Sequence, residues 1–301
     1  MSKNKCSKSR IVFVVFNTIV MVAFAALCLA PFINLLAISL SDPLPAVSGQ
    51  VGFLPLGADG KVGIQFDAYR YLLSKSEFFR AFGISVLRVV LGVIISVVVQ
   101  VLAAYPMAQG AKLKGRRFFV VFYTVTMFFS GGLIPTYLVI TSLNLYNTIF
   151  ALVLPTAANA WNMVLFINFF KQIPKELEEY AYLEGAGPLY ILVKIILPVS
   201  LPVVATVTLF TAVAHWNSWF DGYIYMDKEN FPLQTYIYNM INEFATLSKS
   251  TDPNMQELIK NLPGKTIRSA QIFVAMVPIM LVYPFVQKFF IRGLTLGAVK
   301  E

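Results

Sequence analysis

The side chains that could carry out chemistry are few in this chain. It has one histidine, His215, and two cysteines, Cys6 and Cys28. Zinc sites and disulfide frameworks need clusters of cysteine or histidine, so the sequence predicts neither. The long apolar segments hold no pair of carboxylates or histidines that could relay protons. We therefore expect no catalytic centre, no metal site and no bound cofactor.

Two short stretches resemble nucleotide-binding sequences but lack the residues that such sites need. The residues Pro-Gly-Lys-Thr at 263–266 look like the end of a phosphate-binding loop. That loop requires a glycine five residues before Gly264, and Ile259 stands there. Gly-Ala-Gly at 185–187 hints at a dinucleotide fingerprint, but Tyr190 occupies the third glycine position. We reject both as nucleotide sites.

The composition shows which solvent surrounds these residues. Hydrophobic residues make up 57% of the 301 residues, and charged residues make up 13%. A soluble domain is usually about 45–50% apolar and about 25% charged. The excess apolar content indicates a bilayer, and we expect an all-α membrane protein.

Six long apolar segments are candidates for transmembrane helices, each near the roughly 20 residues that cross a bilayer. They lie at 11–40, 82–107, 118–140, 148–170, 195–215 and 270–290. The first is too long for a signal peptide. The resulting division is a segment 1–10, a first helix 11–40, an external loop 41–81, a five-helix core 82–291 with loops 171–194 and 216–269, and a tail 292–301.

Orientation follows from the basic residues, which gather on the cytoplasmic side of membrane proteins. The loop 109–117 holds four basic residues, whereas the loop 141–147 on the other side has no charge. Both termini, the loop 109–117 and the loop 171–194 are therefore predicted to be cytoplasmic. The net charge of +9 then reflects orientation, and we expect no nucleic-acid partner.

Two polar residues lie at the outer ends of predicted spans. Arg88 is the clear charge inside a span, and we expect its long side chain to reach the interface as a structural anchor. His215 stands beside Trp216 and Trp219, and tryptophan is typical of membrane interfaces. We expect a positioning role for His215.

The segment 173–198 differs from the other loops. Its residues predict two short helices separated by a turn at Gly185 and Gly187. Pro174 suits the first position of one helix and Pro188 that of the next. Acidic residues follow Pro174, where the helix dipole favours negative charge. Two interpretations stay open on these grounds alone: a cytoplasmic knob that another protein contacts, or an amphipathic hairpin on the membrane surface.

The same segment resembles the cytoplasmic "EAA" loop of permeases in ATP-binding-cassette importers. That loop reads Glu-Ala-Ala, three residues, Gly, nine residues, Ile, one residue, Leu-Pro. The matching positions are Glu179, Ala181, Gly185, Ile195, Leu197 and Pro198. Tyr180 stands where the first alanine is usual, and Glu184 replaces the common aspartate before the glycine. With Ala186, these positions form the expected ATPase-coupling loop.

Further segments are similar to the oligosaccharide branch of these permeases. They lie at 129–136, 168–174, 215–221, 283–288 and 292–297. The resemblance implies a six-helix permease of the type I importer architecture in the cell membrane, without catalytic activity of its own. It also implies a second permease subunit, two cytoplasmic ATPase subunits and an external solute-binding protein as partners.

The substrate is less well defined by the sequence. Asn159, Trp161 and Asn162 lie in the fourth span, where they either line the pathway or hold helices together. Carbohydrate import is the function that we favour. The alternatives are the same superfamily with another solute, an ion-coupled secondary transporter, and a membrane-bound enzyme. The last two need clustered ionisable residues that the predicted spans lack.

Overall fold

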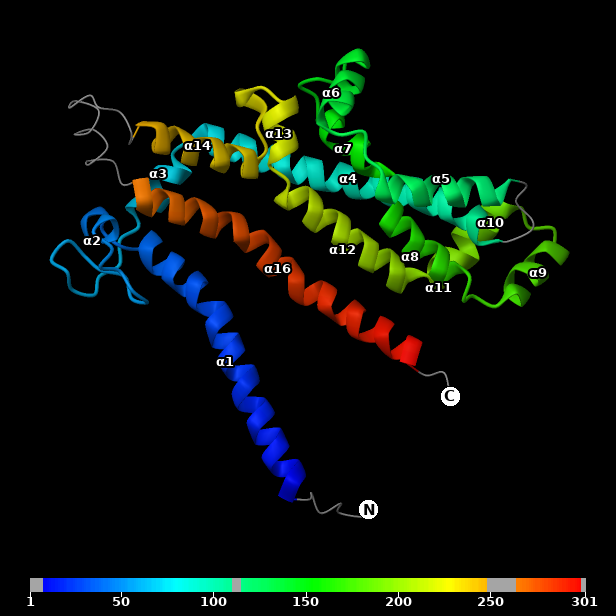
Figure 1. Ribbon diagram of the computed structural model, residues 1–301, viewed down its shortest axis with the longest axis horizontal. Helices are drawn as coiled ribbons and strands as arrows, with labels where there is room; N and C mark the ends of the chain where they lie inside the picture. The colour runs from blue at the N-terminus through cyan, green and yellow to red at the C-terminus, as the bar shows by residue number, and fades with distance from the viewer. Residues whose placement is uncertain (1–7, 110–114, 248–263, 299–301) are drawn as a thin grey trace. The chain divides into compact units, whose positions relative to one another are not determined.

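The computed structural model describes residues 8–109, 115–247 and 264–298, and these are almost entirely helical (Figure 1). The helices are α1 (Lys8–Ser39), α2 (Pro43–Val47), α3 (Asp67–Leu73), α4 (Ser76–Ala108), α5 (Arg116–Phe128), α6 (Leu133–Ser142), α7 (Ile149–Ala157), α8 (Ala160–Phe170), α9 (Lys175–Leu183), α10 (Pro188–Ile191), the π-helix η2 (Leu192–Ile196), α11 (Leu197–Val199), α12 (Leu201–Asn217), α13 (Phe220–Tyr225), the 3₁₀-helix η3 (Lys228–Asn230), α14 (Leu233–Leu247) and α16 (Gly264–Ala298). Within the described residues, extended pairing is limited to one bridge between Leu56 and Val62.

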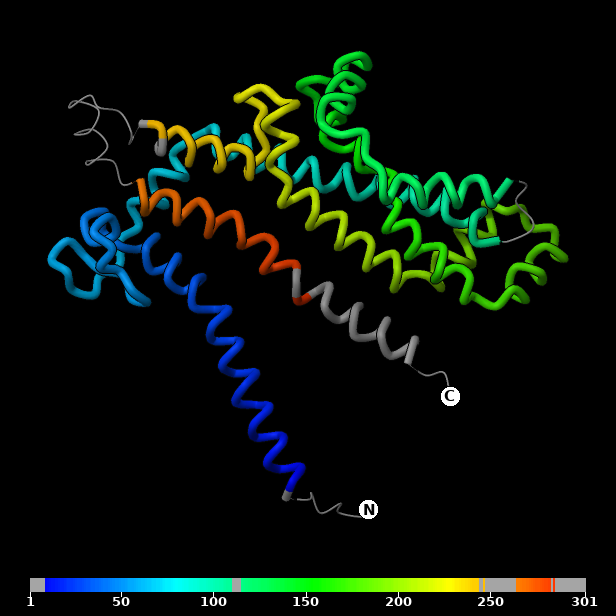
Figure 2. Tube along the Cα trace, viewed as in Figure 1, coloured from blue at the N-terminus to red at the C-terminus, as the bar shows by residue number. Residues whose placement is uncertain are grey.

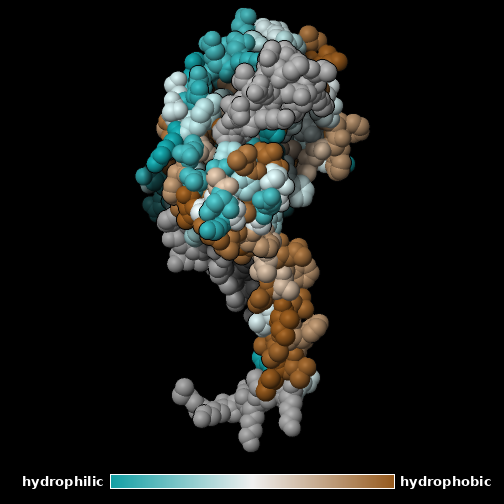
Figure 3. Space-filling view, turned by 90° about the vertical axis from the view of Figure 1, so that its left-hand side faces the viewer, coloured by the Kyte–Doolittle hydropathy of each residue, from teal (hydrophilic) through white to brown (hydrophobic). Residues whose placement is uncertain are grey.

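Three helices are long and apolar enough to cross a bilayer by themselves: α1, α4 and the first part of α16. Hydrophobic side chains cover α1 in the space-filling view (Figure 3). Three further helix pairs qualify when each bent pair is one span: α5 with α6, α7 with α8, and the segment Pro188–Val199 with α12. Together they correspond to the six predicted segments.

The three bent pairs break where the sequence interrupts helical hydrogen bonding. The bend of 118° between α5 and α6 falls at Phe129–Gly132, and Gly132 has φ +84°. The bend of 47° between α7 and α8 falls at Asn159, which caps α8 by accepting the amide of Asn162 at 3.0 Å. The bend of 83° before α12 falls at Ser200, between Pro198 and Pro202.

Two segments predicted as loops contain helices. The segment 41–81 holds α2 and α3 and the start of α4, and the segment 216–269 holds α13, η3, α14 and the start of α16. Their polar composition hid amphipathic helices, of which α14 is the clearest because one side of it is apolar.

The chain divides into two compact units, which we describe separately. The first comprises Met1–Ser76 and Asn239–Met276. Its small clusters lie at the end of α1, where Ala37 packs with Ala46 and Val51, and between α3 and α16, where Ala68 packs with Ile267 and Ala270. The hydroxyls of Ser39 and Tyr69 are 2.7 Å apart. Burial raises the pKa of Tyr69, and the hydrogen bond with Ser39 opposes this effect only in part. The pKa is therefore above its usual value, and the phenol stays neutral.

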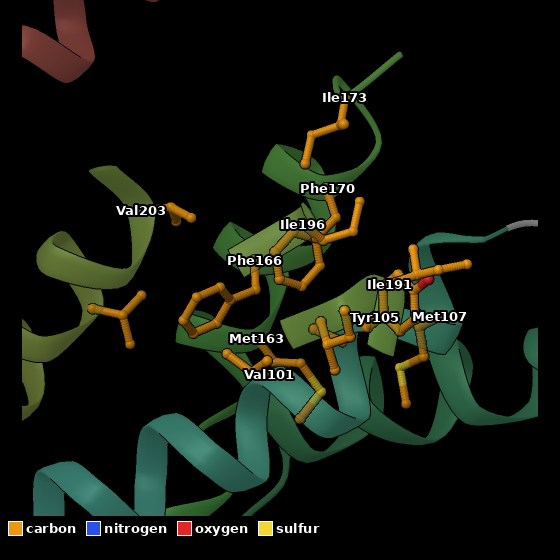
Figure 4. Close-up of a cluster of buried hydrophobic side chains, with 13 residues drawn as sticks. Val101, Tyr105, Met107, Met163, Phe166, Phe170, Ile173, Ile191, Ile196 and Val203 are labelled. Atoms are coloured by element: carbon orange, nitrogen blue, oxygen red, sulfur yellow. The ribbon is translucent and has the colours of Figure 1, made fainter. Parts of the chain in front are cut away.

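The second unit comprises Glu77–Tyr238 and Val277–Glu301, and it holds the main core. Figure 4 shows the central cluster, in which Tyr105, Phe166 and Phe170 pack together. Side chains of α4, α8, α10, η2 and α12 meet there. Within this unit, α13 lies beside the first half of α4, whereas α10 lies at the other end of α4 and α9 lies beyond it (Figures 1 and 2).

Candidate functional site

The predicted coupling loop forms two short helices, α9 and α10, as its sequence indicates. Pro174 is the N-cap residue rather than the first helical residue, so α9 begins one position later than expected. Glu176 and Glu178 lie in the first turn of α9, where the helix dipole favours negative charge. Pro188 occupies the start of α10.

The turn after α9 is a Schellman motif, in which two amides bond back to carbonyls of the last helical turn. The amide of Ala186 donates to the carbonyl of Ala181 at 2.9 Å, and the amide of Gly185 donates to the carbonyl of Tyr182 at 3.0 Å. Gly185 has φ +80°, which favours glycine strongly. A Cβ atom on Gly185 would meet nothing within 4 Å, so backbone conformation rather than crowding accounts for the glycine.

The loop residues divide into an inward and an outward set. The inward set is apolar and packs against the central cluster: Ala181, Ala186, Ile195 and Leu197. The outward set is exposed: Glu179, Tyr180, Glu184, Gly185 and Pro198. The inward residues therefore fix the loop to the spanning helices, and the outward residues form its free surface.

A polar contact that sequence reasoning missed joins this loop to α4. The side-chain amide of Gln109 donates to a carboxylate oxygen of Glu178 at 3.2 Å. No local pattern could have predicted this contact, since Gln109 and Glu178 lie 69 positions apart.

The connection from α10 to α12 passes through the π-helix η2. Pro198 has no amide hydrogen, so the carbonyl four residues before it cannot receive its usual bond. Wider π turns form where the helical ladder is interrupted in this way, and they are frequent at functional sites. Ile195 and Leu197 of the loop motif therefore belong to the start of the fifth span.

A second feature is a polar cavity of about 580 Å³ in the same unit. Its lining comes from α4, the α7–α8 junction, α12, and α13 with the residue Ser218 before it: Arg88, Thr156, Asn159, Trp161, Asn162, Phe210, Thr211, Ala214, His215, Ser218 and Asp221. The three predicted pathway residues of the fourth span are therefore together at one cavity. Asn162 donates to Thr211 at 3.4 Å, whereas the side chain of Trp161 is exposed.

The expectation that Arg88 extends to the membrane interface is wrong. Its side chain is 1% exposed and forms an ion pair with Asp221 through both terminal nitrogens. Its Nε donates to Nδ1 of His215 at 3.4 Å, and Nη1 also donates to the carbonyl of Ser218 at 3.1 Å. A buried guanidinium requires such a counter-charge, and Asp221 lies in a segment that sequence reasoning treated as loop.

His215 is held in place by close packing rather than by the interface. Its ring lies against Gly92 of α4, where an added Cβ would come within 2.4 Å of ring atoms. Glycine at this position therefore makes room for the imidazole. The positioning role stays a prediction, but the partners of His215 are Arg88 and Gly92.

The opposite side of α12 borders a cavity of another character. It measures about 550 Å³, and its lining is almost entirely apolar, with Leu209, Val213 and Trp216 from α12 and Pro278 and Ile279 from α16. Thr211 and His215 face the polar cavity instead. One helix thus separates a polar space from an apolar one.

The nucleotide-like sequences have no loop geometry where the structure describes them. Lys265 and Thr266 lie in the first turn of α16, and Ile259 lies outside the described residues. Gly187 has φ −76° and caps α10. These observations agree with the rejection of both sequences as nucleotide sites.

Comparison with known proteins shows the family to which this chain belongs. The sequence pattern of a protein family matches residues 7–296, nearly the whole chain. The chain belongs to the family of binding-protein-dependent transport system inner membrane components. The permease is therefore an integral membrane subunit of a transport system with other subunits, as the resemblance implied.

Relatives and a solved structure support this assignment. The permease is 38% identical over 280 residues to the polygalacturonan/rhamnogalacturonan transport system permease protein YtcP of Bacillus subtilis, covering 92% of this chain and 94% of that one. It is 35% identical over 295 residues to protein LplC of the same organism, covering 98% and 97%.

A bacterial ABC transporter involved in the import of the acidic polysaccharide alginate has a similar crystal structure. Its matching chain has a TM-score of 0.82 and 30% identity, covering 94% of this chain and 98% of that chain. The all-α importer-permease fold is confirmed.

Proposed function

We propose that the permease is a subunit of an ATP-driven, binding-protein-dependent importer of carbohydrate, and that it forms half of the translocation pathway. The names of its relatives support a sugar or an oligosaccharide as the substrate. YtcP is named as a permease protein of a polygalacturonan/rhamnogalacturonan transport system, and the transporter of similar structure is involved in the import of alginate. The polar cavity supports the same choice, since amide and hydroxyl groups suit a hydroxyl-rich solute.

The proposed partners are a second permease subunit, two cytoplasmic ATPase subunits and an external solute-binding protein, with the lipid bilayer around the spans. The permease itself binds no cofactor and hydrolyses no ATP in this proposal. In this proposal the chain consists of a cytoplasmic segment 1–10, a first transmembrane helix 11–40, an external loop 41–81, a five-helix core 82–291 and a cytoplasmic tail 292–301. The distribution of basic residues supports the side of the membrane given to each part.

The observation that carries the proposal is the outward surface of the α9–α10 element. Leu183 is 83% exposed and Tyr180 is 71% exposed, and Leu189 and Tyr190 of α10 are exposed beside the turn. Large apolar side chains gathered on a short polar loop mark a protein contact. Exposed aromatic and aliphatic residues of this kind fill the cleft of an ATPase partner.

The same element is suited to transmit a movement. Its inward residues pack on the central cluster, which also includes Phe166 of α8 and Val207 of α12. A displacement of the ATPases would therefore reach the spanning helices through close-packed side chains rather than through a loose loop. Such coupling requires contacts that differ between the inward-facing and outward-facing states.

A matched pair of substitutions tests the docking surface. Leu183→Glu places a charge on the proposed contact, and Leu143→Glu places one on a leucine that is 61% exposed in the predicted external loop 141–147. We expect Leu183→Glu to abolish co-purification of the ATPases with the permease, and Leu143→Glu to leave it intact. Equal recovery of the ATPases with both variants would refute the proposed role of α9 and α10.

A further inference from the structure

The polar cavity presents a mixture of side chains that is unusual between membrane helices. Thr156, Asn159, Asn162 and Thr211 contribute uncharged hydrogen-bonding groups. Polar groups in a bilayer need partners, and they cluster along solute paths for that reason. The volume of about 580 Å³ lies within the usual range for small-ligand sites. The cavity is thus large enough and polar enough for a small hydrophilic ligand.

The charges of this cavity cancel. The guanidinium of Arg88 uses all three of its nitrogens, bonding His215, Ser218 and Asp221. Asp221 in turn accepts the hydroxyl of Ser218 at 2.7 Å and the amide of Gly222 at 2.9 Å. An anionic ligand needs a cation with free donors. The guanidinium of Arg88 is 1% exposed and already paired with Asp221, so this cavity presents no accessible cation to a carboxylate.

The remaining groups suit a sugar ring. Trp161 is 63% exposed and lines the cavity, where its flat apolar surface can lie against the C–H face of a sugar ring. The side-chain oxygen of Asn159 accepts the amide of Asn162 and so caps α8, and the side-chain amide of Asn162 donates to the hydroxyl of Thr211. These bonds fix both amides in place, so they are oriented before a ligand arrives.

We propose that this cavity is a carbohydrate subsite that binds one sugar ring through its hydroxyls and its apolar face, and that it does not distinguish an acidic sugar from a neutral one. In this arrangement Trp161, Asn159 and Asn162 contact the sugar. Arg88, Asp221 and His215 are positioning residues that hold the wall of the cavity. The inference rests on the proposed function as a carbohydrate importer.

The test uses the complete transporter in lipid nanodiscs and a sugar in a charged and an uncharged form. Cys6 and Cys28 are replaced by serine, and Thr156→Cys introduces one thiol into the polar cavity. Ala212→Cys is the control, because Ala212 lines the apolar cavity across the same helix. The probes are trigalacturonate and its fully methyl-esterified form. The rate of modification by iodoacetamide is measured against sugar concentration.

We expect both sugars to slow modification of the cysteine at 156, at concentrations that agree within about threefold, and to leave the cysteine at 212 unaffected. Adding Trp161→Ala should raise the protecting concentration by about tenfold, because stacking on the ring is lost.

Two results would overturn the subsite. One is an absence of protection in a complex that imports these sugars. The other is protection by the acid at a concentration about tenfold or more below that of the ester, which requires a free cation. A complex that imports neither form, nor any neutral oligosaccharide of similar length, would count against the proposed function, and the subsite would fall with it.

Discussion

At the scale of single residues, the buried guanidinium of Arg88 sets the requirements for its neighbours. Asp221 supplies the counter-charge, and His215 and Ser218 receive the remaining donors. The contacts join α4 to the end of α12 and to α13. A charge at this depth is stable only while its partner is present.

Removal of one partner should therefore cost more than removal of both. We expect Asp221→Asn to lower the free energy of unfolding by about 3 kcal/mol, since it leaves the guanidinium buried and uncompensated. The double variant Arg88→Met/Asp221→Asn should recover part of that loss. Denaturant unfolding of the permease in detergent measures both. If the double variant loses as much free energy of unfolding as Arg88→Met and Asp221→Asn lose together when measured singly, the two charges do not depend on each other.

Gly92 provides a test of packing against His215. An added Cβ would come within 2.4 Å of the imidazole, so Gly92→Ala should lower the free energy of unfolding by about 1–3 kcal/mol. Gly83 lies in the same helix, and a Cβ there would meet nothing within 4 Å. Gly83→Ala should therefore raise stability, by up to about 1 kcal/mol. The same unfolding measurement compares the two, and equal effects would contradict the close contact.

The sequence singled out candidate residues, whose roles stay predictions, but it could not predict their environments. It indicated the coupling loop and the candidate pathway residues of the fourth span. It did not predict that Arg88 is buried, because its partner Asp221 lies 133 positions away in a segment without an apolar pattern. The contact of Gln109 with Glu178 escaped for the same reason. Pairing across distant segments depends on tertiary packing, which a local pattern does not contain.

At the scale of elements, the apolar runs predicted where spans lie but not how they bend. A run of hydrophobic residues is the same signal for a straight helix and for a broken one. The breaks depend on Gly132, Asn159 and Ser200, which are short polar or small residues between apolar ones. The helices α13 and α14 were missed because their polar sides resemble loop composition.

The turn between α9 and α10 gives an element-scale prediction. Gly185→Val forces a β-branched residue to φ +80°, which is strained, whereas asparagine tolerates this conformation. We expect Gly185→Val to reduce sugar-stimulated ATP hydrolysis by roughly tenfold and Gly185→Asn to retain most of it. Gly187→Val is the matched control, because Gly187 has φ −76° and open space around it. Full activity of Gly185→Val would rule out the turn as a coupling element.

At the scale of the whole molecule, the distribution of charge and apolar surface determines how the chain lies in the membrane. The side chains along α1 are exposed and apolar, as a helix surrounded by lipid requires. Basic residues are concentrated at one set of loop ends. The first feature predicts that α1 spans the bilayer, and the second predicts cytoplasmic termini.

Single cysteines, introduced into a permease whose Cys6 and Cys28 are replaced by serine, test this orientation in intact cells. Ser48 follows α2 in the predicted external loop, and Arg117 is the second residue of α5, at the end of the predicted cytoplasmic loop 109–117; both are exposed. An impermeant thiol reagent should label Ser48→Cys in intact cells and label Arg117→Cys only after the membrane is opened. The reverse pattern would invert the topology and place α9 and α10 away from any cytoplasmic ATPase.

The central claim is that the permease forms part of an ATP-driven importer of carbohydrate. Its most direct test is uptake of a labelled oligosaccharide by proteoliposomes that hold this chain, a second permease and two ATPase subunits, with the binding protein outside and ATP inside. We predict uptake that stops when the ATP, the ATPases or the binding protein is omitted, that a protonophore does not affect, and that Gly185→Trp abolishes while Gly187→Trp does not. Uptake by this chain alone, driven by an ion gradient without ATP, would contradict the account.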